Sequence, residues 1–416
     1  MNNVMPEPTA GTVFTRNTIP MDLWITKGQG TVIVDSQGRR MLDFCSQTLN
    51  LSLGHCHPMV NSVMSQTMRC YTFLSSRFAN PHTVDLAYRL AELAPFANAR
   101  VNVKLASGSG ANECALKAAY KRRGSTLVVS MRGSHHGQTM ETMRISGKHF
   151  DASYLDRTNV RYLQPCDCGS LGEVTCHCAD ALAVLLSDLG EQVAAMILEP
   201  VMVDAGVLVP SRGFLQQVRA LTQQYGIPLI FDEIQTGMGW CGELFMSNAY
   251  QVSPDAITLG KGLAAGLPLA ATLLRSDMDV LDYGEHEFTP GGNPLFCAVA
   301  LANLGLLLEG GLLACVSQKG ARLRANLEDL QKEFPHAVAK VRGLGLIYGI
   351  QLVGDTEEKL ALRVFHECIN RGLLLRISKV GERSDVLQIK PPLTVEDDEI
   401  DTAVSILRDV IKEIVS

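Results

Sequence analysis

The sequence has no apolar run of the roughly 18–20 residues that a membrane-spanning helix requires, so a role inside a bilayer is not expected. It also lacks the basic start and apolar block of a secretory signal, since residues 1–14 include Pro6, Glu7 and Pro8. No long basic run is present and the formal net charge is -6, which argues against a nucleic-acid or anionic-membrane partner. These absences make the cytoplasm the expected compartment and leave a small-molecule substrate open.

Twelve cysteines are spread through the chain, and most stand singly inside apolar runs, as Cys114, Cys297 and Cys315 do. In a reducing compartment such thiols are expected to be buried and free, so no structural disulfide is predicted.

Four other cysteines form two Cys-x-Cys pairs within 13 residues, Cys166 with Cys168 and Cys176 with Cys178. A tetrahedral zinc ion takes four sulfur ligands, although the usual pairs have two or more residues between ligands. The cluster therefore has two interpretations, a structural zinc site and a cysteine-rich surface loop.

The length and the alternation of apolar segments indicate an α/β protein with a large and a small domain. With 416 residues, 46% of them hydrophobic and 19% charged, the chain can bury a substantial core. Strands are expected at 101–105, 126–130, 194–198, 228–231 and 256–259, and helices at 111–123, 213–225 and 293–308. Short, wholly apolar strands between helices predict a mostly parallel sheet that is covered on both faces.

The last hundred residues change character and predict a smaller α+β domain. A charged helix is expected at about 317–334, a strand at 345–353, and further helices from 356 and from 396. Residues 20–45 are also strand-rich. The predicted organisation is an N-terminal segment at 1–50 that joins the small domain, a large domain at 51–310, and a C-terminal small domain at 311–416.

Two charged residues stand where expected strands end. Asp232 follows the strand at 228–231, and Lys261 follows the strand at 256–259 between two glycines. In open α/β sheets ligands bind beyond the carboxyl ends of the strands, so both side chains are placed near a ligand. A salt bridge at the sheet edge is one interpretation. The other is a lysine that forms an imine with a carbonyl cofactor and an aspartate that keeps a pyridine nitrogen protonated.

Two glycine-containing turns could hold a phosphate. The segment SGSGANE (107–113) follows a strand and opens a helix, where free backbone N–H groups and the helix dipole favour an anion. The segment TPGGNP (289–294) is a second hydroxyl-and-glycine turn before a helix. Each signal is weak alone, because such turns are common, but beside Lys261 and Asp232 they favour the cofactor interpretation.

These motifs, in this order, make the chain resemble the class III, fold-type I aminotransferases that use pyridoxal 5′-phosphate (PLP). The resemblance runs from Gly28 to Pro392. The matching segments are LDF (42–44), GHCHP (54–58), SGSGANE (107–113), SHHG (134–137), EP (199–200), FDEIQTG (231–237), LGKGL (259–263), TPGGNP (289–294) and PPL (391–393).

The resemblance implies the roles of the residues that bind the cofactor's ring. Lys261 would carry PLP as a Schiff base and later move the proton, Asp232 would pair with the pyridine nitrogen, and Gln235 would bond the ring hydroxyl. His135 stands where the family usually has an aromatic residue stacked on the ring, and an imidazole can also stack. A turn histidine without a ligand is the alternative for His135. Glu199 would lie near the substrate.

The resemblance also implies how the phosphate is held and how the chain assembles. Gly108 and Ser109 would hold the phosphate. Thr289 would reach the phosphate bound by a neighbouring subunit, which implies a homodimer with shared active sites.

Several positions depart from the family pattern and bear on the substrate. Family members that use glutamate and 2-oxoglutarate have an arginine three residues before the paired prolines, and this chain has Gln388 there. A guanidinium binds a carboxylate through two charge-assisted bonds, which glutamine cannot replace. Lys390 is close by, on a face that the sequence does not settle. Arg376 resembles a carboxylate-binding arginine of some class III members and is the predicted substrate ligand, with an exposed strand arginine as the alternative.

Three further positions are ambiguous. Gly110 replaces an acid of the family's phosphate loop, and Trp240 lies in GWCG (239–242) where the family has Gly-Arg-Thr-Gly. Trp240, and Trp24 in the N-terminal segment, either line the substrate pocket or fill packing space.

The sequence thus predicts a PLP-dependent class III aminotransferase, a transferase that moves an amino group between an amine or amino acid and a keto acid or aldehyde. Amino acid or secondary metabolism is the expected setting. The alternative is a PLP-dependent racemase, epimerase, lyase or other Cα-bond enzyme on the same fold, since all of these labilise one bond at Cα. A non-catalytic protein of this fold, or an interaction module built on the cysteine cluster, is disfavoured by the joint presence of Lys261, Asp232, Gln235 and Thr289.

Overall fold

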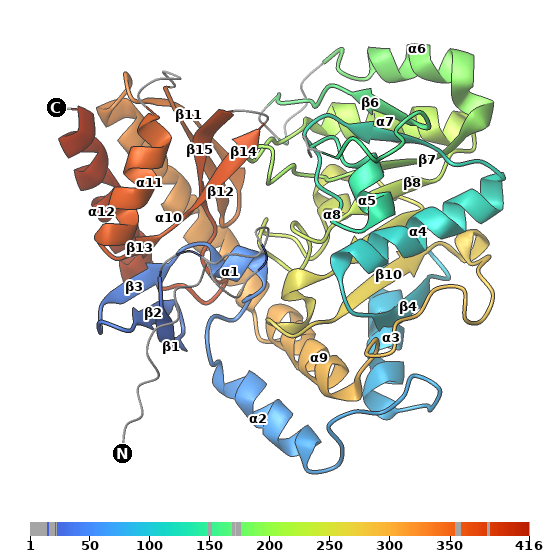
Figure 1. Ribbon diagram of the computed structural model, residues 1–416, viewed down its shortest axis with the longest axis horizontal. Helices are drawn as coiled ribbons and strands as arrows, with labels where there is room; N and C mark the ends of the chain where they lie inside the picture. The colour runs from blue at the N-terminus through green and yellow to red at the C-terminus, as the bar shows by residue number, and fades with distance from the viewer. Residues whose placement is uncertain are drawn as a thin grey trace.

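The protein is divided into two halves that meet along one side (Figure 1). The right-hand half holds the middle of the chain, and the left-hand half combines both ends, with the blue N-terminal strands below the orange and red C-terminal elements. This computed structural model describes Thr15, Met21 and residues 23–148, 152–168, 171, 176–353, 359–380 and 383–415.

A seven-stranded sheet forms the centre of the large half. Its strand order is β4-β10-β9-β8-β7-β5-β6. The strands are β4 (Arg100–Leu105), β5 (Leu127–Met131), β6 (Val160–Leu163), β7 (Val193–Leu198), β8 (Leu229–Asp232), β9 (Ala256–Leu259) and β10 (Ala270–Leu274). Only β10 runs antiparallel to its two neighbours. The predicted mostly parallel sheet is therefore confirmed.

Helices cover both faces of this sheet because its strands are apolar on both sides. Alternate residues such as Val128, Ile197 and Ile230 pack with α4 (Gly108–Arg123) in one core cluster. Their neighbours pack in a second cluster with the three helices α3 (Pro81–Leu93), α7 (Arg212–Gln224) and α9 (Pro294–Leu308). Four more α-helices belong to this half, α2 (Pro58–Met68), α5 (Met140–Ile145), α6 (Asp180–Leu189) and α8 (Met246–Tyr250), and the short α1 (Ser46–Leu49) lies where the two halves meet.

The long helices begin and end at residues that satisfy their terminal groups. The Ser107 side chain accepts from the Gly110 N–H at the start of α4, and Gly124 ends that helix in the left-handed region. Asn293 caps α9, whose first residue is Pro294. These caps place the starts of α4 and α9 within a few residues of the sequence predictions.

The small half is built from both ends of the chain. One sheet has the order β1-β2-β3-β13 and a second the order β11-β12-β15-β14. The strands are β1 (Ile25–Gln29), β2 (Val32–Asp35), β3 (Arg40–Asp43), β11 (Val338–Leu344), β12 (Ile347–Leu352), β13 (Leu373–Leu374), β14 (Arg376–Val380) and β15 (Arg383–Ile389), and the helices are α10 (Leu312–Glu333), α11 (Leu360–Asn370) and α12 (Asp397–Val415). Strand β3 pairs in parallel with β13, so the N-terminal strands are part of this half. The exact domain boundaries stay a prediction.

Among the described residues, no single helix is long and apolar enough to cross a membrane. The helices α9 and α10 reach that length only as a pair, and the pair is bent by 63°.

Candidate active site

Charged and polar residues from five strands meet at the carboxyl edge of the parallel sheet. Lys261 follows β9, Asp232 ends β8, Glu199 follows β7, and His135 follows β5 by way of a short turn. The first turn of α4 comes from β4 at the same edge. The parallel strand order places these segments together, as expected for a ligand site of an α/β sheet.

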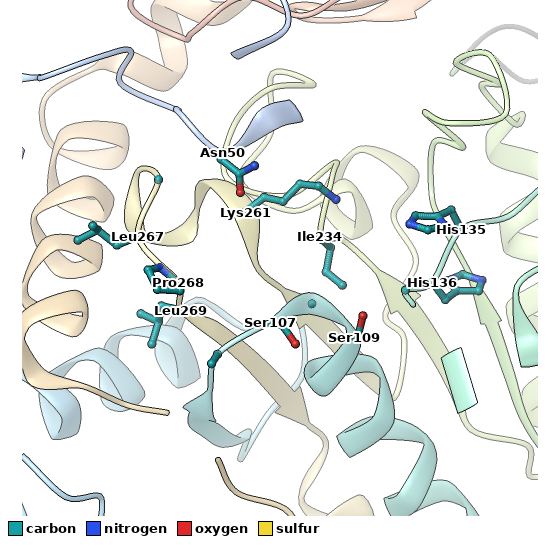
Figure 2. A pocket seen from close by; sticks show the side chains of 14 residues that line it. Asn50, Ser107, Ser109, His135, His136, Ile234, Lys261, Leu267, Pro268 and Leu269 are labelled. Atoms are coloured by element: carbon teal, nitrogen blue, oxygen red, sulfur yellow. The ribbon is translucent and has the colours of Figure 1, made fainter. Parts of the chain in front are cut away.

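A pocket of about 350 Å³ opens at this edge. Figure 2 shows Lys261, Ile234 and His135 around one space, with Ser107 and Ser109 of the α4 turn below them. Leu267, Pro268 and Leu269 form the opposite side. The volume lies within the range typical of small-molecule sites.

Asp232 is held in one orientation by neighbours that the sequence did not single out. Asn112 Nδ2 donates to Asp232 Oδ2 at 2.8 Å, and His136 Nδ1 lies 2.8 Å from the same oxygen. The Ile234 N–H donates to Oδ1 at 3.1 Å. Asn112 is itself fixed because its Oδ1 accepts from Thr258 Oγ1 at 2.7 Å. Such supporting hydrogen bonds fix the direction in which a functional carboxylate points.

The start of α4 has the features of a phosphate cradle. The first N–H groups of a helix have no intrahelical partner, and the helix dipole favours negative charge there. Gly108 and Ser109 provide these groups and line the pocket. A Cβ atom at Gly108 would lie 2.7 Å from Ile234 Cδ1, and one at Gly137 would lie 2.3 Å from Ser109 Oγ. Glycine at both positions therefore allows Ile234 and Ser109 to pack closely against the backbone that lines the pocket.

His135 and Glu199 form the side of the site next to Asp232. The His135 N–H donates to Glu199 Oε1 at 2.8 Å, and burial lowers the pKa of the imidazole to about 4, which keeps the ring neutral. Burial and the nearby Asp232 carboxylate raise the pKa of Glu199 well above its usual value. Among the described residues, no hydrogen-bond partner reaches the buried Glu199 Oε2. A buried acid of this kind is protonated readily and can donate to a ligand.

Lys261 has the properties of a reactive amine. Burial lowers its pKa from 10.5, against the opposing charges of Asp204, Asp232 and Glu199. Its backbone adopts a left-handed conformation with φ 42°, which is strained for a side chain other than glycine. A lysine with a lowered pKa has more of the neutral amine that can attack a carbonyl group.

A second charged group lies on the small-half side of the site. Arg376 is the cross-strand partner of Gln388 in the β14–β15 pair, so the two side chains share a face. Gln388 is buried and donates to Val203 O at 3.0 Å, and Lys390 Nζ donates to Gln388 Oε1 at 2.6 Å. Lys390 therefore points toward Gln388, which settles the orientation that the sequence left open.

The negative charge of Asp204 offsets the positive charges of Arg376 and Lys390. No sequence motif had identified Asp204 as a site residue. It lies 3.9 Å from Arg376 Nη2 and 3.9 Å from Lys148 Nζ. Burial alone would raise the pKa of Asp204, but the charges of Arg376, Lys390 and Lys148 outweigh it and hold the pKa at about 2. Burial and the charge of Arg376 lower the pKa of Lys390 to about 7.

Seven residues predicted for the cofactor and substrate site do not line the Lys261 pocket, namely Trp24, Glu199, Asp232, Gln235, Trp240, Thr289 and Arg376. Trp240 is buried, donates to Pro391 O at 3.0 Å, and packs where a Cβ of Gly262 would lie 2.4 Å from its ring, which favours the packing interpretation. Trp24 is 37% exposed, just before β1. Gln235 is buried in the turn after β8, and Thr289 is exposed before α9.

The donor set fits PLP. The α4 turn suits its phosphate, the space between His135 and Ile234 suits a flat ring, and Lys261 can meet its aldehyde carbon. Asp232 offers a fixed carboxylate for the pyridine nitrogen. Ile234 lies within the FDEIQTG segment, and its place in the pocket was not predicted.

Sequence comparison supports the same assignment. Residues 13–411 match the family described as aminotransferase class-III. The chain is 35% identical over 387 residues to an acetylornithine aminotransferase of Thermosynechococcus vestitus, covering 91% of this chain and 90% of that protein. It is 29% identical over 408 residues to the mitochondrial ornithine aminotransferase of Arabidopsis thaliana, covering 94% of this chain and 82% of that protein.

Solved structures agree with this result. An ω-aminotransferase from Paracoccus denitrificans matches with a TM-score of 0.89 at 25% identity, covering 98% of both chains. An amine transaminase from an uncultivated Pseudomonas species, in its PLP-bound form, matches with a TM-score of 0.86 at 28% identity, again covering 98% of both chains. The predicted fold and the predicted family are both confirmed, and the chain belongs to the class III aminotransferases, with PLP as the cofactor that the family implies.

Proposed function

We propose that this class III aminotransferase takes its amino group from a donor that carries a carboxylate, and that Arg376 binds this carboxylate. The observation that supports the proposal is the pairing of Arg376 with Gln388 across β14 and β15. Gln388 occupies the position at which family members that use glutamate have an arginine. Arg376 carries a guanidinium on the adjacent strand, on the same face, with a third of its side chain exposed to solvent.

The charges around Arg376 support its availability to a ligand. Its partner Asp204 is 3.9 Å away, longer than a close charge-assisted hydrogen bond, so a substrate carboxylate can compete for the guanidinium. Lys390 is tied to Gln388 and has a pKa of about 7, because burial and the charge of Arg376 disfavour a second cation there. Unlike Lys390, the Arg376 guanidinium stays charged at neutral pH and is able to bind a carboxylate.

The remaining roles follow from the geometry around Lys261. When bound, PLP would withdraw electrons from the bond broken at Cα of the substrate. Lys261 Nζ, whose pKa is lowered by burial, would accept the Cα proton of the substrate. It would later give a proton back to complete the amino-group transfer. Asp232 would hold a proton on the pyridine nitrogen, positioned by Asn112 and His136. The α4 turn would anchor the phosphate, and His135 would cover one face of the ring.

A homodimer is part of the proposal. Apolar side chains are exposed in one region, Phe73 and Phe78 after α2 and Phe288 beside Thr289. These segments lie together, since Asn293 Nδ2 donates to Thr72 O at 3.3 Å. Exposed apolar patches often mark subunit contacts, and a twofold contact here would place Thr289 near the partner's site.

We propose that the protein works in the cytoplasm. All twelve cysteines lie in the described residues and none of them is joined to another by a disulfide, which suits a reducing environment.

A single-turnover assay tests the proposed reaction. Enzyme loaded with PLP is mixed with a panel of amino acids and of amines without a carboxylate, in the absence of any keto acid, and cofactor absorbance and product are followed. We expect one equivalent of keto product per site from carboxylate-bearing donors and none with Lys261→Ala. Racemised or Cα-deuterated substrate without keto product would instead establish the alternative Cα chemistry. If amines without a carboxylate react as well as carboxylate-bearing donors, the proposed role of Arg376 is wrong, but the proposed transamination stands.

A further inference from the structure

The two Cys-x-Cys pairs come together in the folded chain, although their first cysteines are ten positions apart in the sequence. Cys166 and Cys168 follow β6, and Cys176 and Cys178 precede α6. Their four Sγ atoms all lie within 4.8 Å of one another. The Cys166–Cys168, Cys166–Cys176 and Cys168–Cys178 sulfur distances are 3.3, 4.0 and 3.9 Å.

These distances match the ligand shell of one tetrahedral ion. A zinc ion with four sulfur ligands at about 2.3 Å places the sulfurs roughly 3.8 Å apart. The three sulfur distances bracket that value. They are also far longer than the bond of about 2.0 Å that joins the sulfurs of a disulfide. The four sulfurs are therefore spaced as the ligands of one ion would be.

The chemistry of the donors selects the ion and its role. Four thiolates are soft ligands that bind zinc well and bind magnesium or calcium poorly. With all four positions taken by protein, no site remains for water or substrate, which is the pattern of a structural rather than a catalytic zinc. His177 lies between two of the cysteines, but it is 86% exposed and pairs with Asp180, so it is not a ligand.

The cluster is connected to both halves of the molecule. Cys176 Sγ lies 3.4 Å from Ser211 Oγ, the side chain that caps α7 in the large half. Asp167, between Cys166 and Cys168, accepts from Lys340 Nζ at 2.7 Å, and Lys340 belongs to β11 of the small half. Residues beside the cluster thus contact both halves.

A second contact extends this connection toward the loop that carries Asp204. Arg342 Nη1 lies 3.8 Å from Asp167 Oδ2, and Arg342 Nε donates to Gly206 O at 2.7 Å. Lys340 and Arg342 thus place two cations against Asp167, the residue between two of the cysteines, where four bound thiolates would add negative charge. None of the four cysteines lines the Lys261 pocket, so this site is independent of the proposed reaction.

We propose that Cys166, Cys168, Cys176 and Cys178 bind one structural zinc ion that holds residues 166–168 and 176–178 together. The ion would fix Asp167 where it contacts Lys340 and Arg342, and so stabilise the contact between the two halves.

Metal analysis of the whole protein tests the proposal. The full chain is purified without added zinc and without chelators, and its metals are measured by mass spectrometry. We expect about one zinc per chain. The double variant Cys176→Ser/Cys178→Ser should retain less than about a tenth of that zinc, whereas Cys315→Ser, at an exposed cysteine on α10, should retain all of it.

A second measurement tests the site without the double variant, in case that variant does not fold. Wild-type protein produced with cobalt in place of zinc should show the absorption of tetrahedral cobalt bound by four thiolates. Zinc near zero per chain, zinc retained by the double variant, or four cysteines paired as disulfides in the native protein would each overturn the proposal. Cobalt with octahedral absorption would do so as well.

Discussion

Replacing Lys390 by methionine should stabilise the protein at neutral pH and lose that advantage at alkaline pH. Lys390 is fully buried, and burial together with the charge of Arg376 lowers its pKa to about 7 in the folded protein. In the unfolded chain the pKa returns to the ordinary 10.5. Between these values the unfolded chain binds a proton that the folded chain does not, so stability rises with pH across this window.

The magnitude follows from the two pKa values. The lowered pKa of Lys390 reduces the free energy of unfolding by about 4 kcal/mol at pH 7 and by about 1 kcal/mol at pH 10. The difference between the two pH values is about 3 kcal/mol. Methionine does not titrate and has a similar length. The variant also loses the bond from Nζ to Gln388 Oε1, which leaves a buried acceptor unpaired at a cost of about 1–3 kcal/mol, but this cost does not depend on pH.

Urea unfolding of the cofactor-free wild type and Lys390→Met at pH 7 and pH 10 measures the effect. The difference in unfolding free energy between the two proteins should change by about 3 kcal/mol between the two pH values, in favour of the wild type at pH 10. Lys332→Met, at an exposed lysine on α10, serves as the control and should show no comparable change. A wild-type-to-variant difference that is the same at pH 7 and pH 10 would refute the reasoning.

Three other substitutions test the site. Asn112→Ala removes a donor to Asp232 and should lower kcat by about 10–100-fold with little change in KM, and an unchanged kcat would show that His136 suffices. Arg376→Gln should raise the KM of carboxylate-bearing donors by roughly 10–100-fold, and a parallel rise for amines without a carboxylate would indicate general damage instead. Gln388→Arg should lower the KM for glutamate at least about tenfold in steady-state assays, because it adds two charge-assisted bonds, and no gain would place this position outside substrate reach.

The sequence predicted the parts of the fold that depend on local pattern. The strand expected at 256–259 is β9, and that at 194–198 is β7 with one more residue at its start. These strands are buried throughout, mostly apolar, and end at recognisable motifs, so their type and position can be predicted directly from the sequence. Strand β11 was not predicted, because its residues are mixed in polarity and its pairing with β12 depends on a tertiary contact.

The site was predictable only where a motif fixed the backbone. Lys261, Asp232 and the SGSGANE turn follow strands of a parallel sheet, and that topology brings them to one edge. Asp204 could not be found in this way, since it lies in an irregular segment and its neighbours Arg376 and Lys148 come from distant parts of the chain. The orientation of Lys390 also depends on a bond to Gln388 that no sequence pattern announces.

The pairing of β3 with β13 has a consequence for how the chain folds during synthesis. Leu42 pairs with Leu373, and the Lys390 N–H donates to Phe44 O, so the N-terminal strands meet their partners only near the end of translation. At about 5–20 residues per second, strands β1–β3 would wait roughly 20–70 s after they leave the ribosome. During that interval the sheet edge of β3 has no native partner, and non-local pairing of this kind slows folding. We therefore expect the large half to fold first, and the nascent N-terminal strands to be the segment most exposed to aggregation.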